Sequence, residues 1–169
     1  MMERIAAATY LSAGVDETIA LGRVLGTCLS EGDVLVLTGD LGAGKTQLTK
    51  GIAQGLGISD DVTSPTFNIL MVYDGGELPL YHFDLYRLDD PDQLEDTGLF
   101  DVLGGDGVCA IEWGEQFARE IGDERLDVFL TRLDDRAEPG EEPPRELRLV
   151  ANGARAERLA AAFDAALQA

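Results

Sequence analysis

The stretch Gly39-Asp40-Leu41-Gly42-Ala43-Gly44-Lys45-Thr46 decides how the rest of the chain is interpreted. It satisfies the pattern G-x-x-x-x-G-K-[ST], in which glycines let backbone N–H groups turn toward a phosphate, the lysine neutralises phosphate oxygens and the threonine hydroxyl reaches Mg²⁺. Its glycines run G-x-x-G-x-G, which is not the G-x-G-x-x-G order of dinucleotide sites. The loop therefore predicts a nucleoside triphosphate with Mg²⁺ as the ligand, the alternative being a glycine-rich turn with an exposed lysine.

The segments on either side of this loop support the first interpretation. Val34–Thr38 is a short apolar run rich in β-branched residues, typical of a strand buried on both faces. Residues 45–56 carry apolar side chains at helical spacing and end before Gly57. The order strand, glycine-rich loop, helix predicts an α/β fold of the P-loop NTPase type: a mostly parallel central sheet, helices on both faces and peripheral antiparallel strands.

Further periodic segments predict the remaining elements of one domain spanning residues 1–169. The run 108–112 is apolar like Val34–Thr38, so we expect it to lie centrally beside that strand. In the C-terminal helix, Leu159, Phe163 and Leu167 form one stripe, which core packing explains more simply than a partner-binding face. The other expected elements are helix 15–29, strands 67–73 and 80–84, one or two helices in 91–103 capped by Asp89 or Asp90, peripheral strands 127–133 and 146–150, a solvated acidic, Pro-rich loop 134–144, and the helix 154–169 itself.

Composition excludes several classes of protein. The chain has 169 residues and a net charge of −19, so its surface repels a phosphate backbone, and direct nucleic-acid binding is not expected. The same field opposes an anionic ligand, so we expect micromolar nucleotide affinity. Cys28 and Cys109 form no C-x-x-C pair, and no apolar run is long enough to span a membrane. We expect a cytoplasmic protein.

Two carboxylates end predicted strands. Asp84 closes the run 80–84 and Glu112 closes the run 108–112. Ligands of doubly wound sheets bind at the carboxyl ends of the strands, so both acids are expected beside the loop. One acid would serve Mg²⁺ and the other would orient an attacking water. The alternative is that each is a strand-end carboxylate satisfied by its neighbours.

Three further side chains leave alternatives open. His82 is the only histidine, and we expect it to support the site or the fold more readily than to act in catalysis. Trp113 is the only tryptophan and either covers a nucleotide or ends a core strand. Arg87 lies three residues beyond Asp84 and either reaches a phosphate or pairs with an acid.

Four ordered motifs resemble the TsaE family, formerly called YjeE. They are the loop 39–46, Ser64-Pro65-Thr66-Phe67, His82-Phe83-Asp84-Leu85-Tyr86-Arg87 and Glu112-Trp113. The resemblance covers roughly residues 10–133. It implies a bacterial cytoplasmic ATPase required for threonylcarbamoyladenosine (t6A) in tRNA, one that binds the TsaB and TsaD proteins and meets tRNA only through them. It further implies slow, partner-dependent hydrolysis that regulates or resets TsaD without transferring the group.

The resemblance also implies roles for individual positions. Asp40, Leu41, Gly42, Ala43, Gly44, Lys45 and Thr46 would hold the ATP phosphates. Thr46 and Glu112 would ligate Mg²⁺, and Asp84 would line the ATP site, with Asp84 and Glu112 as the catalytic pair. Ser64 and Thr66 lie in a switch-like loop. Val15, Trp113 and Arg145 are further candidates for nucleotide contact; Arg145 follows two prolines here, where relatives have a glycine before the basic residue.

Two other functions fit the same loop. A small-molecule kinase has the same loop but also needs an acceptor pocket and an arginine-bearing lid. Arg119, Arg125 and Arg132 could form such a lid, but they are scattered among acidic residues. A nucleotide-gated binding module would have the same loop but hydrolyse almost no nucleotide. A GTPase is disfavoured, since its base-reading motif needs a lysine and none follows Lys50.

Overall fold

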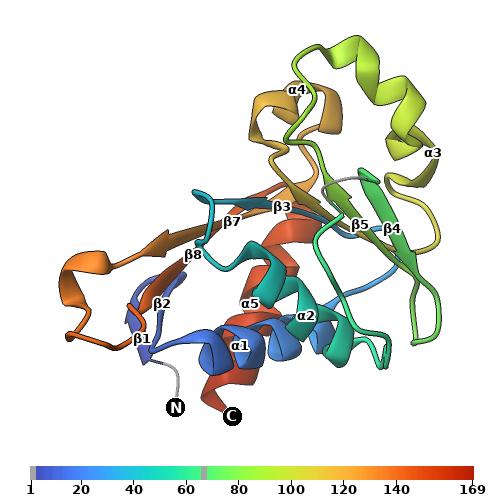
Figure 1. The fold of residues 1–169 in the computed structure, drawn as a ribbon. Coiled ribbons are helices and arrows are strands. Elements are labelled where there is room, and N and C mark those ends of the chain that lie inside the picture. The colour runs from blue at the N-terminus through green and yellow to red at the C-terminus, as the bar shows by residue number, and fades with distance from the viewer. Residues whose placement is uncertain (1–2, 66–67) are drawn as a thin grey trace.

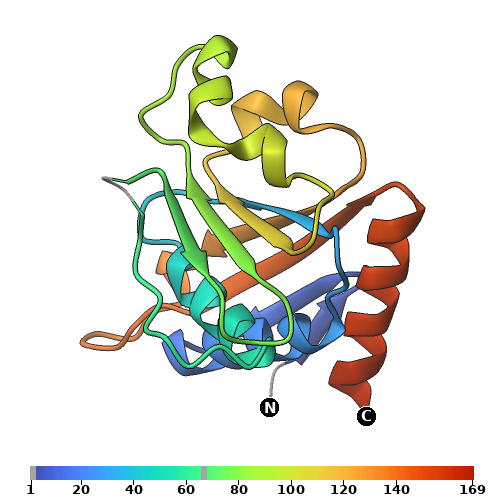
Figure 2. The same ribbon diagram turned by 90° about the vertical axis from the view of Figure 1, so that its right-hand side faces the viewer.

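An eight-stranded mixed sheet runs through the computed structural model, which describes residues 3–65 and 68–169. The strand order is β1-β2-β8-β7-β3-β6-β5-β4. Figure 1 shows α1, α2 and α5 on one face of this sheet and α3 and α4 on the other. Figure 2 shows the same two helical layers from the side. The expected α/β sheet with helices on both faces is confirmed.

The centre of the sheet is parallel. Strand β3 (Val34–Thr38) pairs in parallel with β6 (Val108–Glu112) on one side and with β7 (Arg125–Arg132) on the other. Strand β5 (Leu80–Asp84) extends the parallel set beside β6. Because the carboxyl ends of parallel strands meet at one edge, this order collects the loop after β3 and the ends of β5 and β6 together.

Antiparallel strands flank that centre. Strand β4 (Leu70–Tyr73) pairs with β5, and β8 (Arg145–Asn152) pairs with β7. A hairpin of β1 (Glu3–Ala6) and β2 (Thr9–Ser12) continues the sheet beyond β8. This N-terminal hairpin was not predicted, because its alternation spans only four residues per strand.

The buried side chains form two cores, one on each face of the sheet. Helices α1 (Val15–Cys28), α2 (Lys45–Gly55) and α5 (Ala154–Gln168) cover the larger core, in which Leu159 and Phe163 are buried as the stripe predicted. The smaller core lies under α3 (Leu99–Val102), α4 (Ala118–Ile121) and the 3₁₀ turns η1 (Pro91–Thr97) and η2 (Glu115–Phe117). The predicted cap of segment 91–103 is Asp90, which forms a capping box with Gln93.

Helices α1 and α2 approach each other so closely that only glycine fits between them. A Cβ at Gly51 would overlap the carbonyl oxygen of Ile19, and one at Gly22 would overlap that of Leu48. Gly26 and Gly55 repeat this arrangement one turn further along. The contact holds the helix that follows the glycine-rich loop against the helix that begins at Val15.

One strand lies where the sequence did not predict it. Segment 127–133 was expected at the periphery, but β7 pairs directly with β3 in the centre, so that prediction was wrong. Its alternation is typical of an edge strand because only one face is covered: Leu126, Val128 and Leu130 are buried toward α5, while Asp127 and Phe129 on the other face are half-buried.

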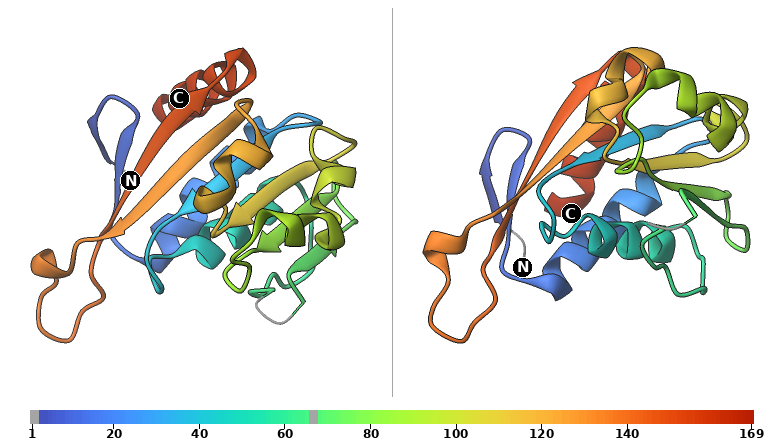
Figure 3. Two further views of the ribbon diagram at one scale, coloured as in Figure 1. Left: turned by 90° about the horizontal axis from the view of Figure 1, so that it is seen from above. Right: turned by 45° about the horizontal axis from the view of Figure 1, so that its top comes forward.

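Segments 67–73 and 134–144 were also assigned from the sequence. The expected strand 67–73 is found from Leu70 onward, and its first residue lies outside the described residues. Segment 134–144 links β7 to β8, contains the 3₁₀ turn η3 (Asp134–Arg136) and projects from the body of the molecule (Figure 3). Among the described residues, no helix is both long and apolar enough to cross a membrane.

Candidate nucleotide-binding site

The loop between β3 and α2 needs glycine at three positions. Gly42 and Gly44 have φ of 84° and 110°, in the left-handed region that favours glycine. At Gly39 a Cβ would lie 2.5 Å from the backbone oxygen of Leu130, so the loop passes too close to β7 for any side chain. The backbone can therefore adopt the tight turn that brings its N–H groups and the start of α2 to one point.

Lys45, the first residue of α2, folds back over this loop. Its Nζ donates a hydrogen bond to the backbone oxygen of Gly39 at 2.6 Å and lies 3.5 Å from the ring centroid of Trp113. The residue is only 5% exposed, and burial lowers its pKa from the ordinary value, although the carboxylate of Glu112 opposes that shift. The hydrogen bond to Gly39 and the contact with Trp113 hold the ammonium group over the loop.

Trp113 itself adopts an unusual backbone conformation. Its φ of 59° is rare for a bulky side chain and marks a strained position directly after Glu112. The indole packs against Tyr86, with ring centroids 5.0 Å apart. Trp113 therefore follows the end of a core strand and also lies beside the lysine of the loop, so both predicted roles stay open.

Glu112 meets Thr46 and His82 at the end of β6. The Thr46 hydroxyl donates to Glu112 Oε2 at 3.4 Å, and His82 Nε2 lies 2.5 Å from the same oxygen. Glu112 is 3% exposed and His82 is fully buried. The two residues predicted to ligate Mg²⁺ are therefore neighbours, although they are 66 positions apart in the chain.

Asp84 occupies the corresponding position at the end of β5, directly opposite Glu112 in the register of the sheet. Its Oδ1 accepts the backbone N–H of Tyr86 at 3.0 Å, and Ser64 Oγ donates to its Oδ2 at 3.5 Å. The predicted switch-like Ser64 thus contacts a predicted catalytic residue. Thr66, the other switch-like candidate, lies outside the described residues.

Arg145 connects the other end of the loop to β8. Its guanidinium donates to the backbone oxygen of Gly42 at 3.4 Å and to that of Pro143, and it pairs with Glu142 at 3.0 Å. The side chain is buried although it follows two prolines. It contacts the loop at the carbonyl of Gly42.

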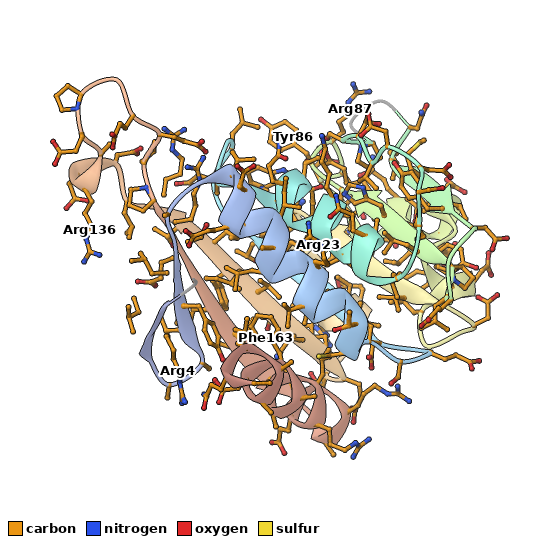
Figure 4. The ribbon with its side chains drawn as sticks, turned by 90° about the horizontal axis from the view of Figure 1, so that it is seen from below. Arg4, Arg23, Tyr86, Arg87, Arg136 and Phe163 are labelled. Carbon is orange, nitrogen blue, oxygen red and sulfur yellow. The ribbon has the colours of Figure 1, made fainter. Side chains whose placement is uncertain are left out.

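These residues surround one cavity of about 420 Å³. Asp40 and Ala43 instead line a second cavity of similar volume on the β7 side of the loop. Arg87 is exposed, and Figure 4 shows it with Tyr86 at the same edge of the molecule, whereas Arg136 lies out on the projecting segment. The predicted residues that line the first cavity are Val15, Leu41, Gly42, Gly44, Lys45, Thr46, Ser64, Asp84, Glu112, Trp113 and Arg145.

Sequence reasoning missed two residues of this cavity. Tyr86 and Gln47 line it, and neither was assigned a role. Tyr86 follows Asp84 by two positions within a quoted motif, so its nearness to the carboxylate was a usable signal. Gln47 follows Thr46 in the first turn of α2, a position that no spacing rule marks.

A glycine-rich loop between a buried parallel strand and a helix, with lysine and threonine opening the helix and a carboxylate ending the next strand, defines an α/β protein with a phosphate-loop site. The chain belongs to the TsaE family. The family model described as "Threonylcarbamoyl adenosine biosynthesis protein TsaE" matches residues 12–139, which confirms the resemblance. The family takes part in the biosynthesis of threonylcarbamoyladenosine in tRNA.

Individual relatives agree over most of the chain. The tRNA threonylcarbamoyladenosine biosynthesis protein TsaE of Bacillus subtilis is 44% identical over 144 residues, which is 85% of each chain. The protein of the same name from Treponema pallidum is 46% identical over 125 residues, 74% of this chain and 92% of its own. The crystal structure of YdiB from Bacillus subtilis superposes with a TM-score of 0.75 at 34% identity, covering 98% of this chain and 97% of that one.

Proposed function

We propose that this chain binds and hydrolyses Mg-ATP, and that hydrolysis regulates or resets the TsaB–TsaD transferase during t6A modification of tRNA without transferring the group itself. One observation carries the proposal: Lys45, Thr46, Asp84 and Glu112, which come from three separate elements, line the same cavity. Its place would be the bacterial cytoplasm, and tRNA would be met only through the two partner proteins.

The loop and Lys45 would bind the phosphates. The N–H groups of residues 42–46 and the positive end of the α2 dipole favour an anion at this point. Lys45 would exchange its bond to Gly39 for the β- and γ-phosphate oxygens, because a backbone carbonyl competes poorly with a phosphate for a buried ammonium group.

Thr46 and Glu112 suit Mg²⁺. Hydroxyl and carboxylate oxygens are the hard donors that this ion prefers, and it takes only one or two carboxylates when phosphates and waters complete its shell. When bound, Mg²⁺ would neutralise phosphate charge.

Asp84 would orient the attacking water. The backbone N–H of Tyr86 holds one of its oxygens, and the hydroxyl of Ser64 reaches the other. A carboxylate held in this way can accept a proton from water without changing its position. The loop that contains Ser64 links this carboxylate to the segment predicted to respond to the γ-phosphate.

The direct test is steady-state ATP turnover with and without purified TsaB and TsaD. We expect slow turnover alone and a clear change with the partners, together with micromolar ATP affinity in calorimetry. Turnover that ignores the partners, combined with phosphate transfer to a metabolite, would indicate a kinase; ATP-dependent partner binding with no turnover would indicate a nucleotide-gated module. The pairing of Arg125 with Asp127 and of Arg132 with Asp134 argues against a kinase lid.

A further inference from the structure

His82 is a buried ionisable side chain to which the proposed reaction gives no role. Its ring has no exposed surface, and its Nε2 lies 2.5 Å from Glu112 Oε2. Its other ring nitrogen, Nδ1, is also buried and has no hydrogen-bond partner in the described part of the chain. A polar ring that is fully buried with a single partner suggests that the partner is the reason for its position.

The two ring nitrogens differ in what they can do. A carboxylate only accepts hydrogen bonds, so the short contact with Glu112 is a donation from Nε2–H. The arrangement therefore indicates a proton on Nε2.

The sheet register brings the two side chains together. His82 pairs with Ala110, and Glu112 follows Ala110 by two residues on the same face of β6. Because the Ala110 side chain ends at Cβ, the imidazole can lean past it toward Glu112. Leu80 and Ala110 belong to the core under α1 and α2, so this face is the one that Thr46 approaches.

Glu112 has little other support. The only other hydrogen bond to its carboxylate among the described residues comes from Thr46 at 3.4 Å, at the long end of the range for such bonds. A carboxylate that is 3% exposed and loses its main donor is free to turn away from the position in which the structure holds it. That rotation would separate the Glu112 oxygen from the Thr46 hydroxyl, with which it would hold Mg²⁺.

We propose that His82 is a positioning residue: its Nε2–H holds Glu112 as an oriented carboxylate for Mg²⁺ at the phosphate loop. This inference rests on the proposed function for its consequence, though not for its geometry. Donors that support a metal-binding carboxylate commonly change metal affinity or activity by about 10- to 100-fold when removed.

The functional test compares His82→Leu with His82→Gln. Leucine fills the space without a donor, whereas the glutamine amide nitrogen can reach about the same point as Nε2. Calorimetry with ATP is run in EDTA and again with Mg²⁺. We expect His82→Leu to keep the affinity measured in EDTA and to raise the Mg²⁺ concentration needed for half-maximal turnover by about 10- to 100-fold. His82→Gln should restore most of the difference.

Leu80→Ala is the matched control for a general loss of stability. Leu80 is fully buried on the same strand and the same face, but it pairs with Val108, four residues before Glu112. Its truncation should lower the melting temperature and leave the Mg²⁺ requirement unchanged. A Mg²⁺ requirement that rises as much in Leu80→Ala as in His82→Leu, or that stays high in His82→Gln, overturns the proposal.

A second measurement needs neither nucleotide nor metal. Because the chain has one histidine, a long-range ¹H–¹⁵N NMR spectrum of the free protein shows a single imidazole. We expect a slowly exchanging proton on Nε2 whose resonance moves upfield in Glu112→Gln. A proton on Nδ1 alone, or an Nε2 proton that exchanges like that of an exposed imidazole, refutes the positioning role. Absence of ATP binding in the wild type would instead refute the proposed function.

Discussion

At the scale of single residues, Lys45 has the clearest assignment, because the chain contains a matched comparison. Lys45 and Lys50 are its only lysines and lie on the same helix. Lys45 is buried over the loop, whereas Lys50 is partly exposed near Asp61 at 4.0 Å. The same substitution at the two positions therefore separates the phosphate loop from the general charge of the protein.

We expect Lys45→Ala to weaken ATP binding by at least tenfold and Lys50→Ala to change it less than twofold. A buried ammonium facing a phosphate makes charge-assisted hydrogen bonds of about 1.5–3 kcal/mol, while a solvent-exposed ion pair contributes about 0–1 kcal/mol. Calorimetric titration of both variants measures the difference. Equal losses in the two variants would show that the loop lysine has no special role.

Glu112→Gln should separate binding from chemistry. The amide keeps the shape of the side chain but lacks the charge that Mg²⁺ prefers, so we expect ATP affinity in EDTA to remain and Mg²⁺-dependent turnover to fall by about 100-fold or more. Radiolabelled phosphate release measures the turnover. Normal hydrolysis in this variant would show that Glu112 is not the metal carboxylate.

Trp113 provides an optical signal for the loop. It is the only tryptophan, and its ring lies 3.5 Å from Lys45 Nζ. Because Lys45 would leave the ring to meet the phosphates, we expect tryptophan emission to change when a non-hydrolysable ATP analogue binds. Lys45→Ala should not show this response. Emission that stays constant while calorimetry records binding would mean that the lysine keeps its place on the ring.

At the scale of elements, the contact between α1 and α2 fixes the position of the loop. Gly22 and Gly26 on α1 face Gly51 and Gly55 on α2, and a side chain at any of them would overlap backbone atoms. The atoms that such a side chain would meet are backbone atoms, which cannot move aside by a change of rotamer. A larger residue must therefore push the helices apart. The cavity between Val15 and Thr46 depends on this contact, because Val15 is the first residue of α1 and Thr46 is the second residue of α2.

We expect Gly51→Ala to lower the free energy of unfolding by roughly 1–3 kcal/mol. Alanine gains about 1 kcal/mol of helix propensity over glycine, but overpacking against the carbonyl of Ile19 costs more. Gly75→Ala is the control, because nothing lies within 4 Å of a Cβ at that position. Urea unfolding compares the two variants. A Gly51→Ala protein as stable as the wild type would show that the helices separate at no cost.

At the scale of the whole molecule, the net charge of −19 determines which partners the surface can meet. Five of its eleven arginines also form ion pairs with carboxylates of the same chain. These pairs are Arg4–Asp164, Arg125–Asp127, Arg132–Asp134, Arg145–Glu142 and Arg155–Asp33. With 13 basic residues against 32 acidic ones, and several of the basic ones already paired, the surface is poorly suited to follow a nucleic-acid backbone.

We expect no measurable binding of tRNA to the isolated chain at 0.1–0.2 M salt, a range over which electrostatic nucleic-acid binding already weakens strongly. Fluorescence anisotropy of labelled tRNA tests this, first with the chain alone and then with TsaB and TsaD present. We expect the anisotropy to rise only when the partners are present. Micromolar affinity of the chain alone would show that a local basic surface overrides the net charge.

The sequence by itself determined the parts of the protein that depend on neighbours along the chain. The glycines, Lys45 and Thr46 lie within eight consecutive residues, so their spacing alone indicates a turn, a helix start and a phosphate. The apolar runs before Asp84 and Glu112 placed those acids at strand ends for the same reason. Backbone dihedral preferences and side-chain periodicity act over a few residues, and patterns of that length carry this information.

Only the tertiary structure decided which distant residues touch. It placed β7 beside β3, Arg145 on the carbonyl of Gly42, and His82 on the carboxylate of Glu112. Each contact depends on strand order or on a register between separate strands, and shifting a register by one residue turns every side chain to the opposite face. The reason is physical: local rules determine what each segment becomes, whereas burial of the shared apolar faces determines which segments meet.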